Sequence, residues 1–180
     1  MVVLSLAVAI AFSGPEILLN FSKLIKYMFI FLIIVGTGFV FHELGHRTVA
    51  RAFGAFAKFR MWPLGLALAL LMSFGGFVFA APGAVYIYSY RHLSREKNGL
   101  ISIAGPLVNI FLFFVFLLFA LFFTVSFEGL NAFYLGAKVN AFLAFFNLLP
   151  FFPLDGSKVI AWDKNVWLFT TIFSFLCFLV

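Results

Sequence analysis

The apolar positions of this chain fall into long runs separated by short polar segments. The runs lie at about residues 2–12, 24–41, 64–81, 100–125, 130–152 and 166–180. Because an α-helix needs about 20 apolar residues to cross a bilayer, the longer runs predict transmembrane helices. The run 2–12 predicts a short or tilted first helix. The last run reaches Val180 without a polar flank, which is what a C-terminal truncation would leave.

One apolar run has the pattern of strands rather than of a span. Gly75 and Gly76 interrupt the run 64–81, and the segments 77–81 and 84–88 flank a Pro82-Gly83 turn. Short apolar segments around such a turn predict two β-strands. We therefore expect an all-α membrane fold, a polytopic transmembrane helix bundle, with one small re-entrant or interfacial β-hairpin.

Composition supports an integral membrane protein. Of the 180 residues, 65% are hydrophobic and 10% are charged, which is too little polar surface to cover a soluble domain. The net charge of +6 arises from basic residues between the apolar runs, where juxtamembrane anchors lie. The expected environment is thus a lipid bilayer, and nucleic acid is excluded as a partner. The single Cys177 excludes an internal disulfide.

Candidate chemistry lies at the end of the second run, where residues 41–47 read Phe-His-Glu-Leu-Gly-His-Arg. Positions four apart share a helix face, so His42 and His46 can present two imidazole nitrogens to one metal ion. Zinc hydrolases use such ligands and keep one position for a water whose pKa zinc lowers to about 7. Glu43 is then the candidate general base. The alternative, that both histidines are packing residues, is weaker because ionisable groups in apolar segments are costly.

A third protein ligand must come from a small set of acids: Glu16, Glu43, Glu96, Glu128, Asp155 and Asp163. Asp155 follows two prolines that end the preceding helix, so its carboxylate is expected at a helix terminus. Taken alone, Pro-Leu-Asp-Gly is typical of a turn with a solvated aspartate. The histidine pair changes that interpretation, because the remaining acids lie in polar turns or loops. Asp155 is the best candidate for the third ligand.

Topology constrains this pairing. His46 and Asp155 can share an ion only if an even number of spans separates them, and the runs 100–125 and 130–152 supply two. The run 64–81 must therefore not cross the membrane. This arrangement puts most lysines and arginines on the side of the metal site, which the positive-inside rule assigns to the cytoplasm.

The chain resembles a known family in three motifs that occur in the same order and at similar spacing. This family is the site-2 protease family of intramembrane zinc metalloproteases, and the resemblance covers residues 24–160 of a single predicted domain, 1–180. The motifs are the segment from His42 to His46, Gly105-Pro106-Leu107-Val108-Asn109, and the segment from Asn147 to Gly156.

The resemblance implies a catalytic core of three transmembrane helices with one Zn²⁺ per chain. Its ligands would be His42, His46 and Asp155, and Glu43 would be the general base. The implied substrate is a transmembrane segment of a membrane-anchored protein. The stretch 47–99 is too short and too apolar for an inserted peptide-binding domain. In this respect the chain resembles the minimal prokaryotic members of the family. The expected location is therefore a prokaryotic cell membrane.

Two further points stay open at this level. Asn147 lies near Asp155 and is a candidate to donate a hydrogen bond to substrate or to the oxyanion, but a helix-packing asparagine is equally compatible. The leading function is an intramembrane zinc endopeptidase. The alternatives are a catalytically inactive scaffold that binds transmembrane helices, and a metal transporter, for which the spans offer almost no ionisable residues. The pattern does not indicate an oligomeric state.

Overall fold

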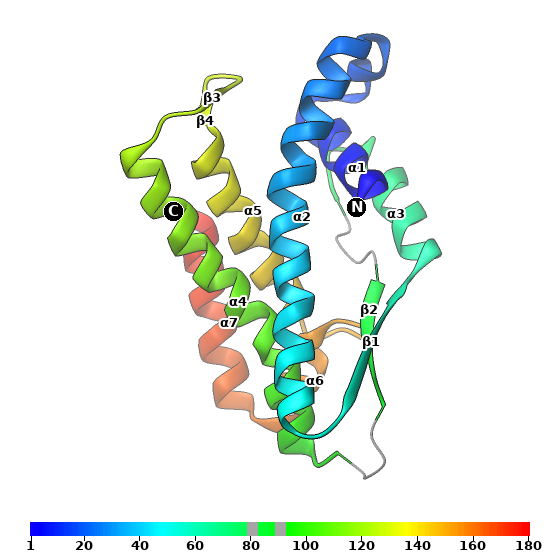
Figure 1. The fold of residues 1–180 in the computed structure, drawn as a ribbon, viewed down its shortest axis with the longest axis vertical. Helices are drawn as coiled ribbons and strands as arrows, with labels where there is room; N and C mark the ends of the chain where they lie inside the picture. The colour runs from blue at the N-terminus through cyan, green and yellow to red at the C-terminus, as the bar shows by residue number, and fades with distance from the viewer. Residues whose placement is uncertain (79–82, 89–92) are drawn as a thin grey trace. The chain divides into compact units, whose positions relative to one another are not determined.

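The computed structural model describes residues 1–78, 83–88 and 93–180, and it is largely helical (Figure 1). Contacts divide the chain into two compact units. The first unit comprises Met1–Thr37 and Phe59–Ala84, and the second comprises Gly38–Lys58 and Val85–Val180. The elements in chain order are α1 (Val2–Ser13), η1 (Pro15–Leu19), α2 (Phe21–Ala52), β1 (Phe56–Met61), α3 (Pro63–Ser73), β2 (Gly83–Tyr88), α4 (Arg95–Phe122), β3 (Ser126–Phe127), β4 (Leu130–Asn131), α5 (Ala132–Asn147), α6 (Asp155–Trp162) and α7 (Lys164–Leu179).

Helices α2 and α4 are long and apolar enough to cross a membrane. They contain 32 and 28 residues, and at about 1.5 Å per residue each exceeds the roughly 30 Å hydrocarbon core of a bilayer. Helix α2 does not end with the apolar run at residue 41 but continues to Ala52. Hydropathy falls at the histidine motif, but the helix continues through it, and His42 and His46 are buried on one face.

The first unit has an apolar core. Helix α1, which confirms the predicted short first helix, packs against α3. The rings of Phe12, Tyr27 and Phe31 meet edge to face, with centroids 5.4 to 6.4 Å apart. The helix in the apolar run 64–81 is α3. It has only 11 residues, so it is too short to span a bilayer.

The strands of the small sheet agree only in part with the sequence prediction. The expected strand at residues 84–88 is present as β2, but β1 is its partner in a two-stranded sheet. Phe77 and Val78 belong to no strand, and residues 79–82 lie outside the described part of the chain. Gly83 permits the close pairing, because a Cβ there would lie 2.5 Å from the carbonyl oxygen of Arg60.

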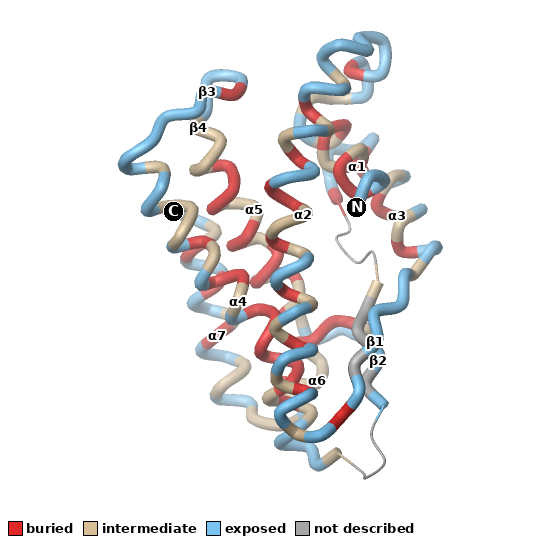
Figure 2. The backbone as a smooth tube through the Cα atoms, in the orientation of Figure 1, coloured by how far each residue is buried: buried red, intermediate tan, exposed pale blue. Residues whose placement is uncertain are grey.

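The second unit is a helix bundle in which α5 packs along α4, with α6 and α7 beside them. Figure 2 shows the buried stretches of α4 and α5. The antiparallel pair β3 and β4 joins these two helices through a turn in which Glu128 and Gly129 have positive φ values of 51° and 78°. Asn131 starts α5 by accepting a hydrogen bond from the Phe133 N–H, 3.0 Å away. Helix α5 ends at Asn147, well before the end of the apolar run at residue 152, because prolines follow.

Candidate metal centre

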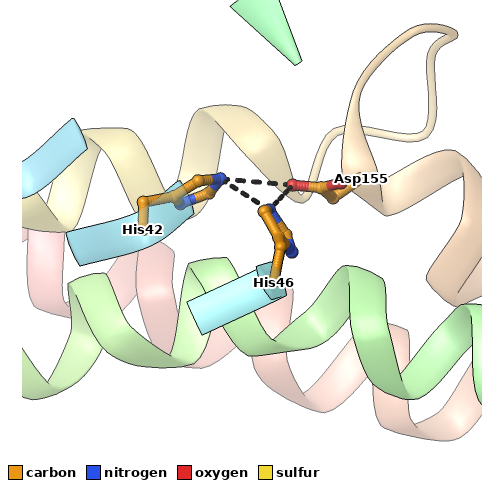
Figure 3. Close-up of side chains that lie close together, drawn as sticks. All are labelled: His42, His46 and Asp155. Atoms are coloured by element: carbon orange, nitrogen blue, oxygen red, sulfur yellow. Dashed lines mark hydrogen bonds and ion pairs between the residues drawn. The ribbon is translucent and has the colours of Figure 1, made fainter. Parts of the chain in front are cut away.

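His42 and His46 lie one turn apart on α2, and their Nε2 atoms point to the same place (Figure 3). The two Nε2 atoms are 3.0 Å apart. The Oδ2 atom of Asp155 lies 3.3 Å from Nε2 of His42 and 3.0 Å from Nε2 of His46. All three residues are at least 90% buried. The structure therefore brings together the three residues that the sequence predicted as ligands.

The segment between α5 and α6 holds Asp155 in place. Asp155 is the first residue of α6, which confirms its expected position at a helix terminus. Gly156 allows the turn to close, because a Cβ at that position would overlap the carbonyl oxygen of Leu148. The same carbonyl accepts a hydrogen bond of 2.8 Å from Nε1 of Trp167 on α7. The carboxylate is thus positioned by α6 together with a backbone segment that α7 anchors.

The outer nitrogens of the two imidazoles also have defined partners. Nδ1 of His46 lies 2.7 Å from the carbonyl oxygen of Ile101. A carbonyl only accepts, so this nitrogen carries a proton and the neutral ring presents a lone pair at Nε2. Nδ1 of His42 lies 2.6 Å from Oδ1 of Asn109. Metal-binding histidines are oriented by hydrogen bonds of this kind, so the arrangement is typical of a metal site.

The donor set fits zinc. Two imidazole nitrogens and one carboxylate oxygen lie within 4.8 Å of one another, and they match the donor types of catalytic zinc sites, which keep one position for water. Nζ of Lys158 lies 3.4 Å from Oδ1 of Asp155, and its positive charge favours the ionised carboxylate that a cation needs.

Helix α4 comes very close to this cluster because of a glycine. A Cβ at Gly105 would overlap Nε2 of His46 and would lie 2.7 Å from Cε1 of His42. At the facing position of α2, a Cβ on Gly45 would lie 3.0 Å from the carbonyl oxygen of Ala104. The motif alone gives no steric reason for Gly105, and that reason is the close packing of α4 on α2.

The two candidate catalytic residues differ in their surroundings. Glu43 is half-buried beside His42, and its Oε2 atom has no hydrogen-bond partner among the described residues. A buried carboxylate oxygen calls for a polar partner, so this atom is available to water or substrate. Asn147, at the end of α5, donates a hydrogen bond of 2.9 Å to the carbonyl oxygen of Leu143 in its own helix. The catalytic roles of both residues stay predictions.

Three curated proteins are similar to this chain in sequence. The chain is 47% identical to "Putative zinc metalloprotease MJ0611" of Methanocaldococcus jannaschii, over 90% of this chain and 82% of that protein. It is 35% identical to "Putative zinc metalloprotease YwhC" of Bacillus subtilis, over 77% of this chain and 69% of that protein. It is 30% identical to "Zinc metalloprotease MJ0392" of M. jannaschii, but there it spans only 33% of the longer relative. No protein-family model matches the chain.

A solved structure shares the fold. The match to a site-2 protease from M. jannaschii has a TM-score of 0.54 and 18% identity, and it covers 98% of this chain and 85% of the other.

The chain belongs to the site-2 protease family of zinc metalloproteases. This site-2 protease homologue is thus a membrane protein and an enzyme whose metal is zinc. Its activity implies a protein substrate.

Proposed function

We propose that this site-2 protease homologue is an intramembrane endopeptidase. It hydrolyses a peptide bond within or near a transmembrane segment of a membrane-anchored protein, and residues 1–180 act as one catalytic domain. The observation that carries the proposal is the buried cluster of His42, His46 and Asp155, in which two ligands lie on a helix long enough to cross a bilayer. We assign these three residues as the ligands of one Zn²⁺.

The residues around the cluster suggest how the reaction proceeds. Bound zinc would polarise the scissile carbonyl and lower the pKa of a water. Glu43 takes a proton from this water through its unpaired Oε2 atom and passes it to the leaving amine. Asn147 can exchange its bond to Leu143 for one to the oxyanion of the substrate, since the broken bond lies within a single helix. Burial of the cluster limits access of bulk water to the reacting groups.

The substrate must lose its helical structure before it can react. In a helix the scissile carbonyl is hydrogen-bonded within the substrate, so the target segment has to become extended. Strands β1 and β2 form a two-stranded sheet in the described part of the chain. We propose that an extended substrate adds to this sheet through main-chain hydrogen bonds. From the positive-inside rule we propose that the zinc site faces the cytoplasm.

The proposal is tested by zinc content per chain and by cleavage of membrane-helix substrates. We expect about one zinc in the wild type and in Glu43→Gln, and little zinc in His42→Ala and Asp155→Ala. Cleavage should occur only in the wild type among these four, because Glu43→Gln keeps the ligands but loses the base. Asp163→Asn is a matched control, since this acid caps α7 and should leave zinc content and cleavage unchanged.

Two results would contradict the proposal. If Asp155→Ala retains zinc, Asp155 is not the third ligand, and the topology inferred from that assignment is wrong. A zinc-loaded wild type that cleaves no membrane-helix substrate under conditions in which a homologous protease does would favour the scaffold alternative.

A further inference from the structure

Three buried polar side chains connect three helices of the second unit. They are His42 on α2, Asn109 on α4 and Asn140 on α5, and both asparagines have no exposed surface. Oδ1 of Asn109 lies 2.6 Å from Nδ1 of His42. Nδ2 of Asn109 donates to the carbonyl oxygen of Gly38 and to Oδ1 of Asn140, both at 3.0 Å. Asn140 in turn donates to the carbonyl oxygen of Gly136 at 2.9 Å.

Two backbone carbonyls determine the direction of every bond in this network. Because the carbonyl of Gly136 can only accept, the amide nitrogen of Asn140 must face it, and Oδ1 of Asn140 must face Asn109. The amide nitrogen of Asn109 then faces two acceptors, Gly38 and Asn140. Its oxygen is left facing Nδ1 of His42, which must therefore carry the proton.

We propose that Asn109 is a positioning residue that fixes the tautomer and the ring orientation of His42. With the proton held on Nδ1, the lone pair of His42 lies on Nε2, the atom that faces His46 and Asp155. The inference rests on the proposed function, because it requires His42 to be a zinc ligand. His46 is oriented independently by the carbonyl of Ile101, so the two imidazoles have different supports.

A role in packing alone does not account for the position of Asn109. A packing asparagine needs acceptors for its amide and a donor for its oxygen, and backbone groups can supply both. Asn140, for example, donates to the carbonyl oxygen of Gly136 in its own helix. The oxygen of Asn109 instead meets an imidazole whose opposite nitrogen belongs to the metal cluster. Partners of this kind typically change metal affinity by about ten- to a hundredfold when they are removed.

Zinc affinity of the full-length protein, measured by competition with a chelator, tests the proposal with two variants. Asn109→Leu has a similar size but no acceptor for Nδ1 of His42, so we expect zinc binding to weaken about ten- to a hundredfold. Asn109→Asp keeps an acceptor, so its zinc affinity should stay within a few-fold of the wild type. Its second oxygen meets the acceptors of Gly38 and Asn140, so its thermal stability should fall. If Asn109→Asp weakened zinc binding as much as Asn109→Leu, the proposal would be overturned.

Asn140→Leu is the matched control on the far side of the network. It removes one partner of the Asn109 amide but leaves the carbonyl of Gly38 to hold its direction. We expect lower thermal stability with zinc affinity within a few-fold of the wild type. If Asn140→Leu weakens zinc binding as much as Asn109→Leu does, then loosening of the bundle explains the loss of zinc affinity in both variants. That result would reject the specific role of Asn109.

A spectroscopic measurement reports on the contact itself. The chain has three histidines, so ¹⁵N-histidine labelling gives a simple imidazole spectrum of the zinc-loaded protein. Asn109→Leu should shift the Nδ1–H resonance of His42 and speed its exchange with solvent, while that of His46 should not move. An unchanged His42 resonance would contradict the proposal.

The variant His42→Ala distinguishes a failure of this inference from a failure of the proposed function. If His42→Ala retains zinc, the ligand assignment itself is wrong. If His42→Ala loses zinc while Asn109→Leu binds it as tightly as the wild type, only the positioning role fails.

Discussion

The two halves of helix α2 bury side chains of opposite character. In the part that belongs to the first unit, the buried residues are Tyr27, Phe31, Ile34 and Val35. After Gly38, where the second unit begins, His42 and His46 are the largest buried side chains of the helix. The same helical periodicity therefore presents an aromatic and aliphatic face in one half and a face with two histidines in the other.

This difference shows what each kind of burial requires. Apolar side chains contribute by close packing, which is not directional and tolerates some substitution. Buried polar groups must each find a partner at the correct angle, or they destabilise the fold. In the second half of α2, both ring nitrogens of His42 and of His46 face a polar group. We infer that the first half mainly supports stability and that the second half mainly supports chemistry.

Among the variants that test this contrast, the largest loss of cleavage is expected from the addition of a single methyl group. Gly105→Ala would place a Cβ against the rings of His42 and His46 without removing a ligand. Displacement of a catalytic group by about 1 Å can cost on the order of a hundredfold in rate, so cleavage should fall at least that far, with weaker zinc binding. Cleavage assays and zinc titration measure both effects.

The matched control for this variant lies in the first half of α2. A Cβ at Gly36 has no described atom within 4 Å, so Gly36→Ala should leave zinc and cleavage unchanged. It should stabilise the helix by about 0.5–1 kcal/mol. Wild-type activity in Gly105→Ala would show that the close approach of α4 is not required.

A second variant tests the apolar half. Phe31 has no exposed surface, and it packs edge to face on Phe12. Phe31→Ala should lower the free energy of unfolding by about 3 kcal/mol through the cavity that it leaves. The folded fraction should still bind one zinc per chain. Unfolding in mixed detergent micelles measures the change, with Phe29→Ala as the control because Phe29 is 63% exposed. Loss of zinc from folded Phe31→Ala would contradict the inference that the two halves of α2 have different roles.

The smallest effect is expected at the edge of the polar cluster. Nζ of Lys158 lies 3.4 Å from Oδ1 of Asp155, and its side chain is 34% exposed. Partly exposed ion pairs contribute about 0–1 kcal/mol, so Lys158→Gln should change zinc affinity by no more than about fivefold. Zinc competition measures this change. A tenfold or larger loss would make Lys158 a part of the metal site rather than its periphery.

Much of the site could be predicted from sequence because its signals are local. The spacing of His42 and His46 on a helix, and the prolines before Asp155, each act within a few residues. The strand partner of β2 could not be found in this way, because the prediction paired adjacent segments whereas β1 precedes α3. The proposed role of Asn109 could not be found in this way either, since an asparagine in an apolar helix has the same local pattern whether it packs or orients a ligand.

The sequence by itself determined a membrane helix bundle, a helix that carries two histidines on one face, and a short list of acids that could join them. Only the tertiary structure decided which groups surround those histidines. The partners of their Nδ1 atoms lie 55 and 67 residues away along the chain, on α4. Such contacts depend on how helices pack and on where a glycine permits close approach. Helical periodicity is a local property, so it places a side chain on a face of its helix but does not specify what that face meets.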